Sequence, residues 1–186
     1  METGGHAFFD GYFDELSRRL HDATIEQLEA LCRIFASTRE RGRKILLAGN
    51  GASAAIASHV AVDLTKAAGI RAVTFNDVDL ITCFANDHGY EQWIAKAIEC
   101  YGDAGDVAVL ISSSGASANV VNAARHARTR GLGVVTLSGF DPDNPLRTLG
   151  DLNLWVNSRS YNIVETTHQS WLLAALDNIA KNGGVA

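Results

Sequence analysis

The chain has 186 residues, of which 47% are hydrophobic and 20% are charged, and only two are prolines. This composition is typical of a globular protein, and the length suits a single domain with a substantial core. The formal net charge of −5 argues against nucleic acid as a partner, because a phosphate backbone attracts basic surfaces.

Cysteine usage and hydropathy indicate the compartment. The three cysteines are odd in number and show no C-x-x-C spacing, so neither a disulfide framework nor a cysteine zinc site is expected. The first residues are polar and acidic, unlike a signal peptide, and no apolar run approaches the ~20 residues that cross a bilayer. We therefore expect a cytoplasmic protein with no membrane partner.

Two amphipathic helices are predicted before any strand, within residues 1–42. Apolar and aromatic residues recur at helical spacing from Phe8 to Leu20 and again from Ile25 to Phe35. Such helices pack either on the following α/β core, residues 43–182, or on another copy of the chain. The aromatic density of the first helix favours an oligomerisation arm, because large apolar faces seldom stay exposed.

Strands and helices alternate through the rest of the chain. Five apolar or alternating segments are predicted as strands, at residues 44–49, 71–75, 107–111, 134–137 and 152–156. Helices are predicted between them, and a long helix from Ile163 to Lys181 closes the chain. This order predicts an α/β fold, a doubly wound parallel five-stranded sheet flanked by helices on both faces. Ligands of such folds bind beyond the carboxyl ends of the strands.

Two turns at predicted strand ends carry the residues of a candidate anion site. Asn50-Gly51-Ala52-Ser53 follows the first strand, and a serine-rich turn at residues 112–119 follows the third. Helix N-termini with unpaired N–H groups, together with hydroxyl donors, favour a phosphate monoester. The glycine turn lacks the G-K-[ST] ending of a Walker A loop and the third glycine of the dinucleotide fingerprint. The alternative is an ordinary turn in which Ser114 or Ser117 caps the helix.

Several motifs resemble those of the sugar isomerase (SIS) domain family. They are Asn50-Gly51-Ala52-Ser53, His59-x-x-x-Asp63-Leu64, Ala85-Asn86-Asp87, Gly105-Asp106-Val107 and Ser112-Ser113-Ser114-Gly115-x-Ser117-x-Asn119. The likeness is greatest to the phosphoheptose isomerases, which interconvert sedoheptulose 7-phosphate and a D-glycero-D-manno-heptose 7-phosphate. The resemblance covers nearly the whole chain, so it implies a single SIS domain over residues 1–186.

The resemblance implies a homotetramer with active sites between subunits and the N-terminal helix in a central bundle. It also implies a small-molecule sugar phosphate as the substrate, with Asp87 on the sugar hydroxyls. The serines expected around the phosphate are Ser53, Ser112, Ser113, Ser114 and Ser117. Asn50, Gly51 and Glu165 complete the expected substrate-binding set.

The catalytic pattern of the family is only partly present. Asp63 stands where those enzymes have a glutamate, so its carboxylate reaches about 1–1.5 Å less far. Those enzymes also carry a Gln and a His eight residues apart on the last helix, and these join the first-helix His and Glu in a zinc site. The corresponding positions here are Val164 and Leu172, which cannot ligate a metal.

Helical geometry suggests His168 as a substitute, because it shares a face with positions 164 and 172. Ketose–aldose exchange needs a base at carbon and an acid at oxygen. We predict Asp63 and His168 for these roles, assisted by His59 or Glu165, with no required cofactor. A zinc site formed by His59, Asp63, Glu165 and His168 is the alternative. His168 is otherwise a core histidine with backbone partners, and Asp63 an ordinary solvated residue.

Three functions are compatible with these residues. The leading hypothesis is an aldose–ketose isomerase of a seven-carbon sugar phosphate, because a phosphate cradle is expected beside a His/Asp helix face. An isomerase of a different phosphosugar is the second. The missing Gln/His pair motivates the third, a non-catalytic tetramer that binds a phosphosugar or serves as a protein scaffold.

Overall fold

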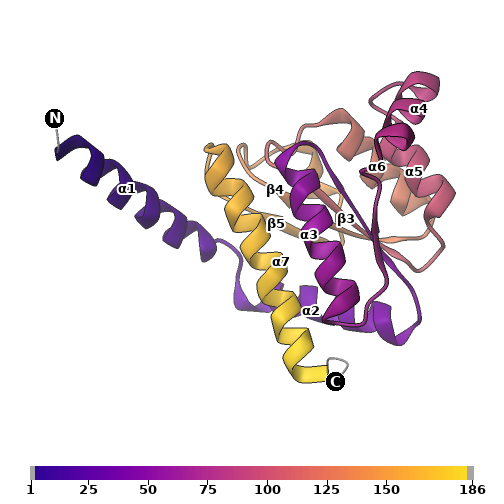
Figure 1. Cartoon of the computed structure of the whole chain (residues 1–186), viewed down its shortest axis with the longest axis horizontal. Helices are drawn as coiled ribbons and strands as arrows, with labels where there is room; N and C mark the ends of the chain where they lie inside the picture. The colour runs from indigo at the N-terminus through magenta and orange to yellow at the C-terminus, as the bar shows by residue number, and fades with distance from the viewer. Residues whose placement is uncertain (1–2, 184–186) are drawn as a thin grey trace.

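A computed structural model describes residues 3–183 and contains one parallel sheet covered by helices on both faces (Figure 1). The five strands lie in the order β2-β1-β3-β4-β5. Their bounds are β1 (Ile45–Gly49), β2 (Ala72–Thr74), β3 (Val107–Ser112), β4 (Gly133–Ser138) and β5 (Leu152–Trp155). The predicted five-stranded parallel sheet is confirmed, and residues 152–155 form its edge strand as expected.

The strand order reverses between β1 and β3, which pair in parallel with Leu47 opposite Val109. Every residue of these two strands is buried, because helices cover the sheet on both sides. Ile45 and Leu47 belong to the core under α2 (Ile25–Glu40), α3 (Ala52–Lys66) and α7 (Tyr161–Gly183). Leu46 and Ala48 belong to the opposite core, under α5 (Trp93–Tyr101) and α6 (Ala118–Thr129).

Two helix boundaries differ from the prediction and change where site residues lie. The sequence predicts a short helix or turn over residues 79–84, but the helix α4 (Val78–His88) runs further, so Asp87 falls in its last turn. The helix α7 begins at Tyr161, two residues before the predicted start at Ile163. The end of α4 has a local cause, because Gly89 follows it with a φ of +85° and its backbone N–H donates to Ala85 O.

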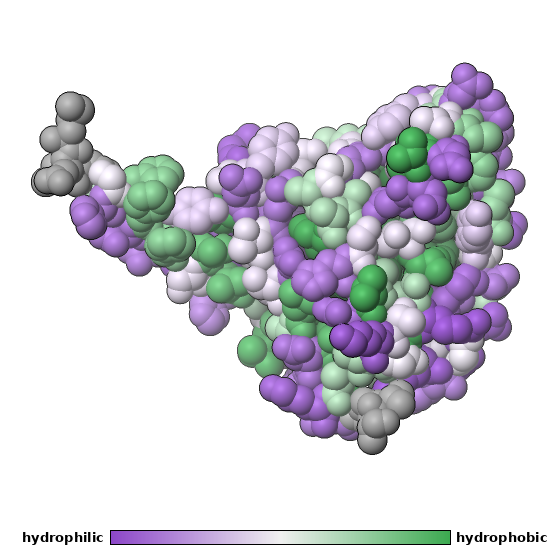
Figure 2. Space-filling model, in the orientation of Figure 1, coloured by the Kyte–Doolittle hydropathy of each residue, from purple (hydrophilic) through white to green (hydrophobic). Residues whose placement is uncertain are grey.

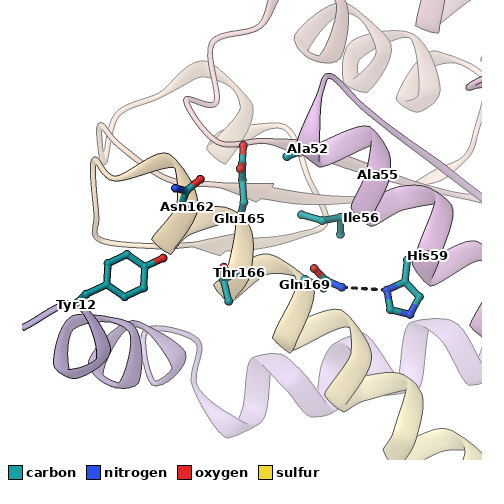
Figure 3. Close-up of a pocket in the computed structure, with 9 residues that line it drawn as sticks. All are labelled: Tyr12, Ala52, Ala55, Ile56, His59, Asn162, Glu165, Thr166 and Gln169. Carbon is teal, nitrogen blue, oxygen red and sulfur yellow. Dashed lines mark hydrogen bonds between the residues drawn. The ribbon is translucent and has the colours of Figure 1, made fainter. Parts of the chain in front are cut away.

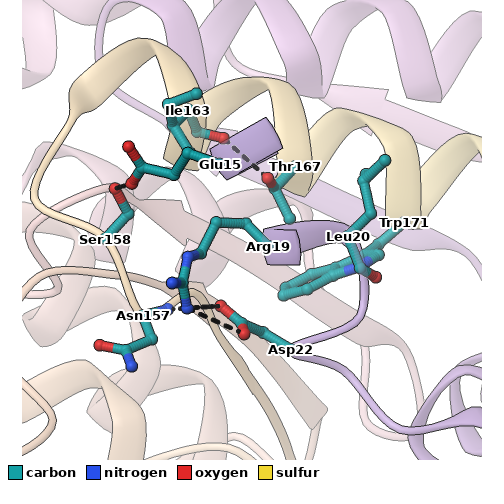
Figure 4. Close-up of polar contacts among 9 residues, drawn as sticks. All are labelled: Glu15, Arg19, Leu20, Asp22, Asn157, Ser158, Ile163, Thr167 and Trp171. Atoms are coloured by element: carbon teal, nitrogen blue, oxygen red, sulfur yellow. Dashed lines mark hydrogen bonds and ion pairs between the residues drawn. The ribbon is translucent and has the colours of Figure 1, made fainter. Parts of the chain in front are cut away.

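The first helix, α1 (Thr3–Leu20), extends away from the rest of the molecule (Figure 1). Its C-terminal end is anchored, since Trp171 Nε1 donates to Leu20 O at 2.9 Å and Ser158 Oγ donates to Glu15 Oε1 at 2.7 Å (Figure 4). Hydrophobic side chains lie along the extended part (Figure 2), where Phe8 is 65% exposed and Phe13 60%. The two leading helices are thus confirmed, and α1 carries an uncovered aromatic face.

None of the described helices is both long and apolar enough to span a lipid bilayer. All three cysteines are free thiols.

Candidate functional site

A cavity of about 120 Å³ lies at the carboxyl ends of β1 and β3, where the strand order reverses. This is the position at which open α/β sheets bind ligands. Its lining residues are Asn50, Ser53, Ile111, Ser112, Ser113, Ser114, Ser117, Tyr161 and Glu165. The glycine turn and the serine turn therefore meet in one cavity, as the sequence predicts. We call this cavity the anion cradle.

Three helices begin at the anion cradle. Ser53 is the second residue of α3, Ser117 is the N-cap of α6, and Tyr161 is the first residue of α7. The first N–H groups of a helix have no partner inside it, and the helix dipole favours negative charge there. The combined effect is a site for an anion, although no lysine or arginine is among the residues that line it.

The serine hydroxyls are not used as helix caps. Ser117 makes no side-chain capping bond to α6, and Ser114 Oγ accepts from Ala116 N at 3.2 Å within the turn. Ser112 Oγ donates to Ser117 Oγ at 3.1 Å. An ordinary turn with a serine cap is therefore not what this segment forms, and the hydroxyls face the cradle instead.

Two asparagines tie the turns of the cradle together. Asn50 Nδ2 donates to Asn119 Oδ1 at 2.9 Å, and Asn119 Nδ2 donates back to Asn50 Oδ1 at 2.8 Å. The hydroxyl of Tyr90 donates to the same Asn50 oxygen at 3.1 Å. This reciprocal amide pair holds the end of β1 against the start of α6. Gly51 lies outside the lining residues and serves as the N-cap of α3.

Asn144 supports the serine turn from behind. It is buried, and its Nδ2 donates to Ser138 Oγ and to Gly139 O, both at 3.2 Å. Gly115 has a φ of +64°, and a Cβ atom there would lie only 1.9 Å from Asn144 Oδ1. Glycine is therefore required at position 115 for both backbone conformation and space.

A larger cavity of about 560 Å³ adjoins the cradle between α1, α3 and α7 (Figure 3). Its lining residues are Tyr12, Ala52, Ala55, Ile56, His59, Asn162, Glu165, Thr166 and Gln169. Glu165 lines both cavities, and its Oε1 accepts from Ser113 Oγ at 3.1 Å. The two cavities together offer a place for an anion beside a place for a longer polar molecule.

His59 lies between two partners. Gln169 Nε2 is 3.0 Å from His59 Nδ1, and Asp63 Oδ2 is 3.2 Å from His59 Nε2 (Figure 3 shows the first contact). Because the Gln169 amide nitrogen is a donor, His59 Nδ1 accepts this hydrogen bond. His59 Nε2 therefore carries the ring proton and donates a hydrogen bond to Asp63. Asp63 itself does not line the larger cavity, so it meets the site through His59.

The predicted placement of His168 is not what the structure shows. His168 is fully buried and lines neither cavity. Its Nε2 donates to Ser138 O at 3.0 Å, and its Nδ1 has no hydrogen-bond partner among residues 3–183. Burial lowers its pKa from 6.5 to about 4, against the smaller opposing effect of the Ser138 hydrogen bond. Val164 and Leu172 are equally buried, because this whole face of α7 packs on the sheet. His168 is therefore a core histidine with a backbone partner, which is the alternative that the sequence leaves open.

The four residues of the possible zinc site are not brought together. His59 and Asp63 are paired, but Glu165 is bonded to Ser113 and His168 faces the core. Within residues 3–183, no group of three or more His, Cys, Asp and Glu side chains is placed to hold a metal ion. The donors present therefore do not fit a four-ligand zinc centre within one chain.

Asp87 is also placed away from the cavities of its own chain. It is exposed in the last turn of α4, where its Oδ1 accepts from Asn86 Nδ2 at 2.9 Å. Tyr161 and Gln169 are among the lining residues that the sequence prediction missed. Gln169 follows His168 directly and so lies on the next face of the helix, which periodicity alone does not orient.

Similarity to known proteins agrees with this geometry. The SIS domain family model matches residues 9–139. Phosphoheptose isomerase of Proteus mirabilis is 40% identical over 134 residues, which are 69% of this chain and 70% of that protein. The solved phosphoheptose isomerase of Neisseria gonorrhoeae has a TM-score of 0.85 at 27% identity, covering 96% of this chain and 100% of that one. The one from Francisella tularensis has a TM-score of 0.87 at 25% identity, covering 97% and 100%.

Proposed function

The chain belongs to the SIS domain family and is related to its phosphoheptose isomerases, and on that premise we propose that it interconverts sedoheptulose 7-phosphate and D-glycero-D-manno-heptose 7-phosphate. The observation that carries the proposal is the anion cradle opening beside the His59 cavity. A phosphate monoester at the end of a polyhydroxy chain matches this pair of cavities. The neutral hydroxyl donors of the cradle and three helix N-termini bind the phosphate.

The sugar chain then lies along α7, in the larger cavity. Glu165 stands at the junction, with Asn162, Thr166 and Gln169 available to the sugar hydroxyls. Fixing the phosphate positions the carbonyl end of the substrate for reaction and converts binding energy into orientation.

Ketose–aldose exchange transfers one proton between two carbons and one between two oxygens. We assign the carbon step to His59. Its Nδ1 accepts from the Gln169 amide at 3.0 Å, and once Gln169 turns to the sugar hydroxyls, Nδ1 takes the C1 proton and returns it to C2 of the enediol. The imidazolium formed in between is stabilised by Asp63, bonded to Nε2 at 3.2 Å. Glu165 accepts the hydroxyl proton of O1 and delivers it to O2. Asp63 thus acts as a positioning residue. In this proposal His59 takes the base role predicted for Asp63, and Glu165 takes the role at oxygen predicted for His168.

The test is direct. Purified protein is mixed with sedoheptulose 7-phosphate, and appearance of the aldose signals is followed by NMR. Conversion supports an enzyme of this substrate; conversion of a five- or six-carbon ketose phosphate alone supports an isomerase of a different phosphosugar. Absence of turnover with all three classes would exclude isomerisation and leave a phosphosugar-binding protein.

A homotetramer with sites between subunits is part of the proposal. It is supported by the uncovered aromatic face of α1 and by Tyr12 of the same helix, which lines the larger cavity. Burying that face against other copies removes apolar surface from water and closes the cavity at its α1 side. A cytoplasmic location also belongs to the proposal, and the three free thiols suit a reducing compartment.

A further inference from the structure

Tyr161 lines the anion cradle, yet no motif of the sequence points to it. We infer that Tyr161 is a substrate-binding residue whose phenolic hydroxyl donates a hydrogen bond to the phosphate group. The inference rests on the proposed function for the identity of the ligand as a phosphate monoester. It adds a donor from α7 to the serine donors of the other two helices.

Each hydroxyl of the cradle has one proton and can donate only one hydrogen bond. Ser112 donates to Ser117, and Ser113 donates to Glu165. These two protons are engaged inside the protein. Within the described part of the chain, the cradle hydroxyls whose protons have no acceptor are those of Ser53, Ser114, Ser117 and Tyr161.

The cradle contains no lysine or arginine among its lining residues, and it contains the carboxyl group of Glu165. A phosphate dianion placed there depends on neutral donors and on helix N-termini for all of its stabilisation. Because hydrogen bonds to charged groups are stronger than neutral ones, each free hydroxyl counts heavily in such a site.

Tyr161 is held in place by an aromatic contact with the loop after β4. Its ring meets the ring of Phe140 edge-on, with centroids 4.8 Å apart and planes at 74°. Phe140 has a φ of +58° and is the one non-glycine residue with positive φ in the described part of the chain. Its backbone N donates to Ser158 O at 3.0 Å, which ties this loop to the segment leading into α7. A strained aromatic residue packed against Tyr161 indicates a preorganised wall.

The competing explanation is that Tyr161 serves only as a packing partner of Phe140. Tyr161→Phe separates the two, because it keeps the ring and its edge-on contact while removing the hydroxyl. Tyr101→Phe is the matched control: Tyr101 is also half-exposed and packs on a phenylalanine, Phe75, at 5.6 Å, but it lies on α5 outside the cradle.

The experiment measures binding of inorganic phosphate and of sedoheptulose 7-phosphate by isothermal titration calorimetry, together with the steady-state kinetics of isomerisation. Tyr161→Phe is expected to raise both dissociation constants about tenfold or more, the loss typical of one hydrogen bond to a charged group. KM should rise by the same factor while kcat stays unchanged, because the phosphate is bound equally in ground and transition states. Tyr101→Phe should change neither.

Unchanged phosphate affinity in Tyr161→Phe would overturn the inference, as would a failure of the wild-type protein to bind phosphate at all. The readouts separate the two proposals. Weakened phosphate binding in Tyr161→Phe, in a protein without isomerase activity, would uphold the role of Tyr161 and reject the proposed reaction. Full isomerase activity with wild-type affinity in Tyr161→Phe would do the reverse.

Discussion

His168 and Glu165 are three residues apart on α7, yet their side chains lie in opposite environments. His168 is fully buried against the end of β4, whereas Glu165 lines both cavities. A helix that covers a sheet has one apolar face toward it and one polar face away from it. His168 therefore contributes to stability, and its protonation is linked to folding.

The first prediction concerns stability at acidic pH. His168 has a pKa of about 4 in the folded chain and 6.5 when unfolded, so between these values the unfolded state binds more protons. Stability then falls as the pH falls through this window, by about 2 kcal/mol between pH 7 and pH 5. His168→Gln keeps an N–H for Ser138 O but does not titrate. Its free energy of unfolding should therefore fall by about 2 kcal/mol less than that of the wild type between pH 7 and pH 5.

Urea unfolding of both proteins at pH 7 and pH 5 gives the measurement. The comparison uses the change with pH in each protein, because the substitution also alters packing. Parallel pH dependences in wild type and His168→Gln would show that this histidine is not buried in its neutral form.

The second prediction concerns the His59 and Asp63 pair. His59→Ala should lower kcat by at least a hundredfold, since it removes the proposed base. Asp63→Asn keeps the shape but removes the charge that stabilises the imidazolium, so a smaller loss of kcat with little change in KM is expected. Asp63→Glu, which keeps the negative charge, should have a kcat between those of Asp63→Asn and the wild type. Asp103→Asn, which removes an exposed carboxylate 2.6 Å from Lys44 Nζ, is the control and should leave kinetics unchanged.

Steady-state kinetics over a range of pH checks this assignment. Loss of the carboxylate should shift the pH profile of kcat/KM, an effect that a purely structural residue would not produce. Wild-type kinetics in Asp63→Asn would show that Asp63 has no role in the reaction. Wild-type kinetics in His59→Ala would show that His59 is not the base.

At the scale of an element, the serine turn depends on the loop after β4. Leu146 N donates to Gly115 O at 3.0 Å, and Asn144 fills the space beside Gly115. The loop thereby sets the position of the hydroxyls in the cradle, although none of its own residues lines that cavity. Its own shape is maintained by Asn144, whose Oδ1 accepts from Arg147 N at 3.0 Å.

The third prediction follows from this support. Gly115→Ala adds a Cβ atom 1.9 Å from Asn144 Oδ1 at a φ of +64°, so either the turn or Asn144 must move. Gly131→Ala is the matched control, because it shares a positive φ of +74° but would meet only Ala104 Cβ at an ordinary 3.7 Å. We expect Gly131→Ala to cost about 1 kcal/mol of unfolding free energy, with no loss of phosphate affinity.

Gly115→Ala should cost more stability than the control and should also weaken phosphate binding. Denaturant unfolding and titration calorimetry with inorganic phosphate measure the two effects separately. Equal costs in the two variants, with phosphate affinity retained, would mean that Asn144 yields freely and does not position the turn.

At the scale of the whole molecule, the proposed assembly depends on the exposed aromatic residues of α1. Phe8, Phe9 and Phe13 are 57–65% exposed on a helix that leaves the body of its own subunit. Phe8 and Phe9 contact each other edge-on at 5.5 Å, which makes a continuous aromatic surface. Such a surface on an extended arm is typical of an interface with other copies.

The fourth prediction is that the wild-type protein has four times the 19.9 kDa mass of one chain in solution. Replacing Phe9 and Phe13 by glutamate should dissociate the assembly, because charges buried at an apolar interface are costly. Replacing the same two residues by leucine keeps the apolar surface and should preserve it. Light scattering coupled to size-exclusion chromatography measures the mass; a monomeric wild type, or a tetrameric glutamate variant, would contradict the role of α1.

The sequence by itself determined the sheet and the turns that face the ligand. Strands buried on both faces are continuous apolar runs, as at residues 107–111, and the turns after them are marked by glycine and serine. These signals are local, so no knowledge of distant contacts is needed. Placement of Asn50, Ser53 and the serine turn in one cavity followed from the rule for strand ends.

Only the tertiary structure decided which face of α7 meets the cavity. Periodicity groups Val164, His168 and Leu172 correctly, but it contains no direction, and packing turned that face toward the sheet. Gln169 and Tyr161 reach the site because α3 and the loop after β4 lie beside α7. These contacts join residues far apart in the chain, so they form only when the whole chain has folded.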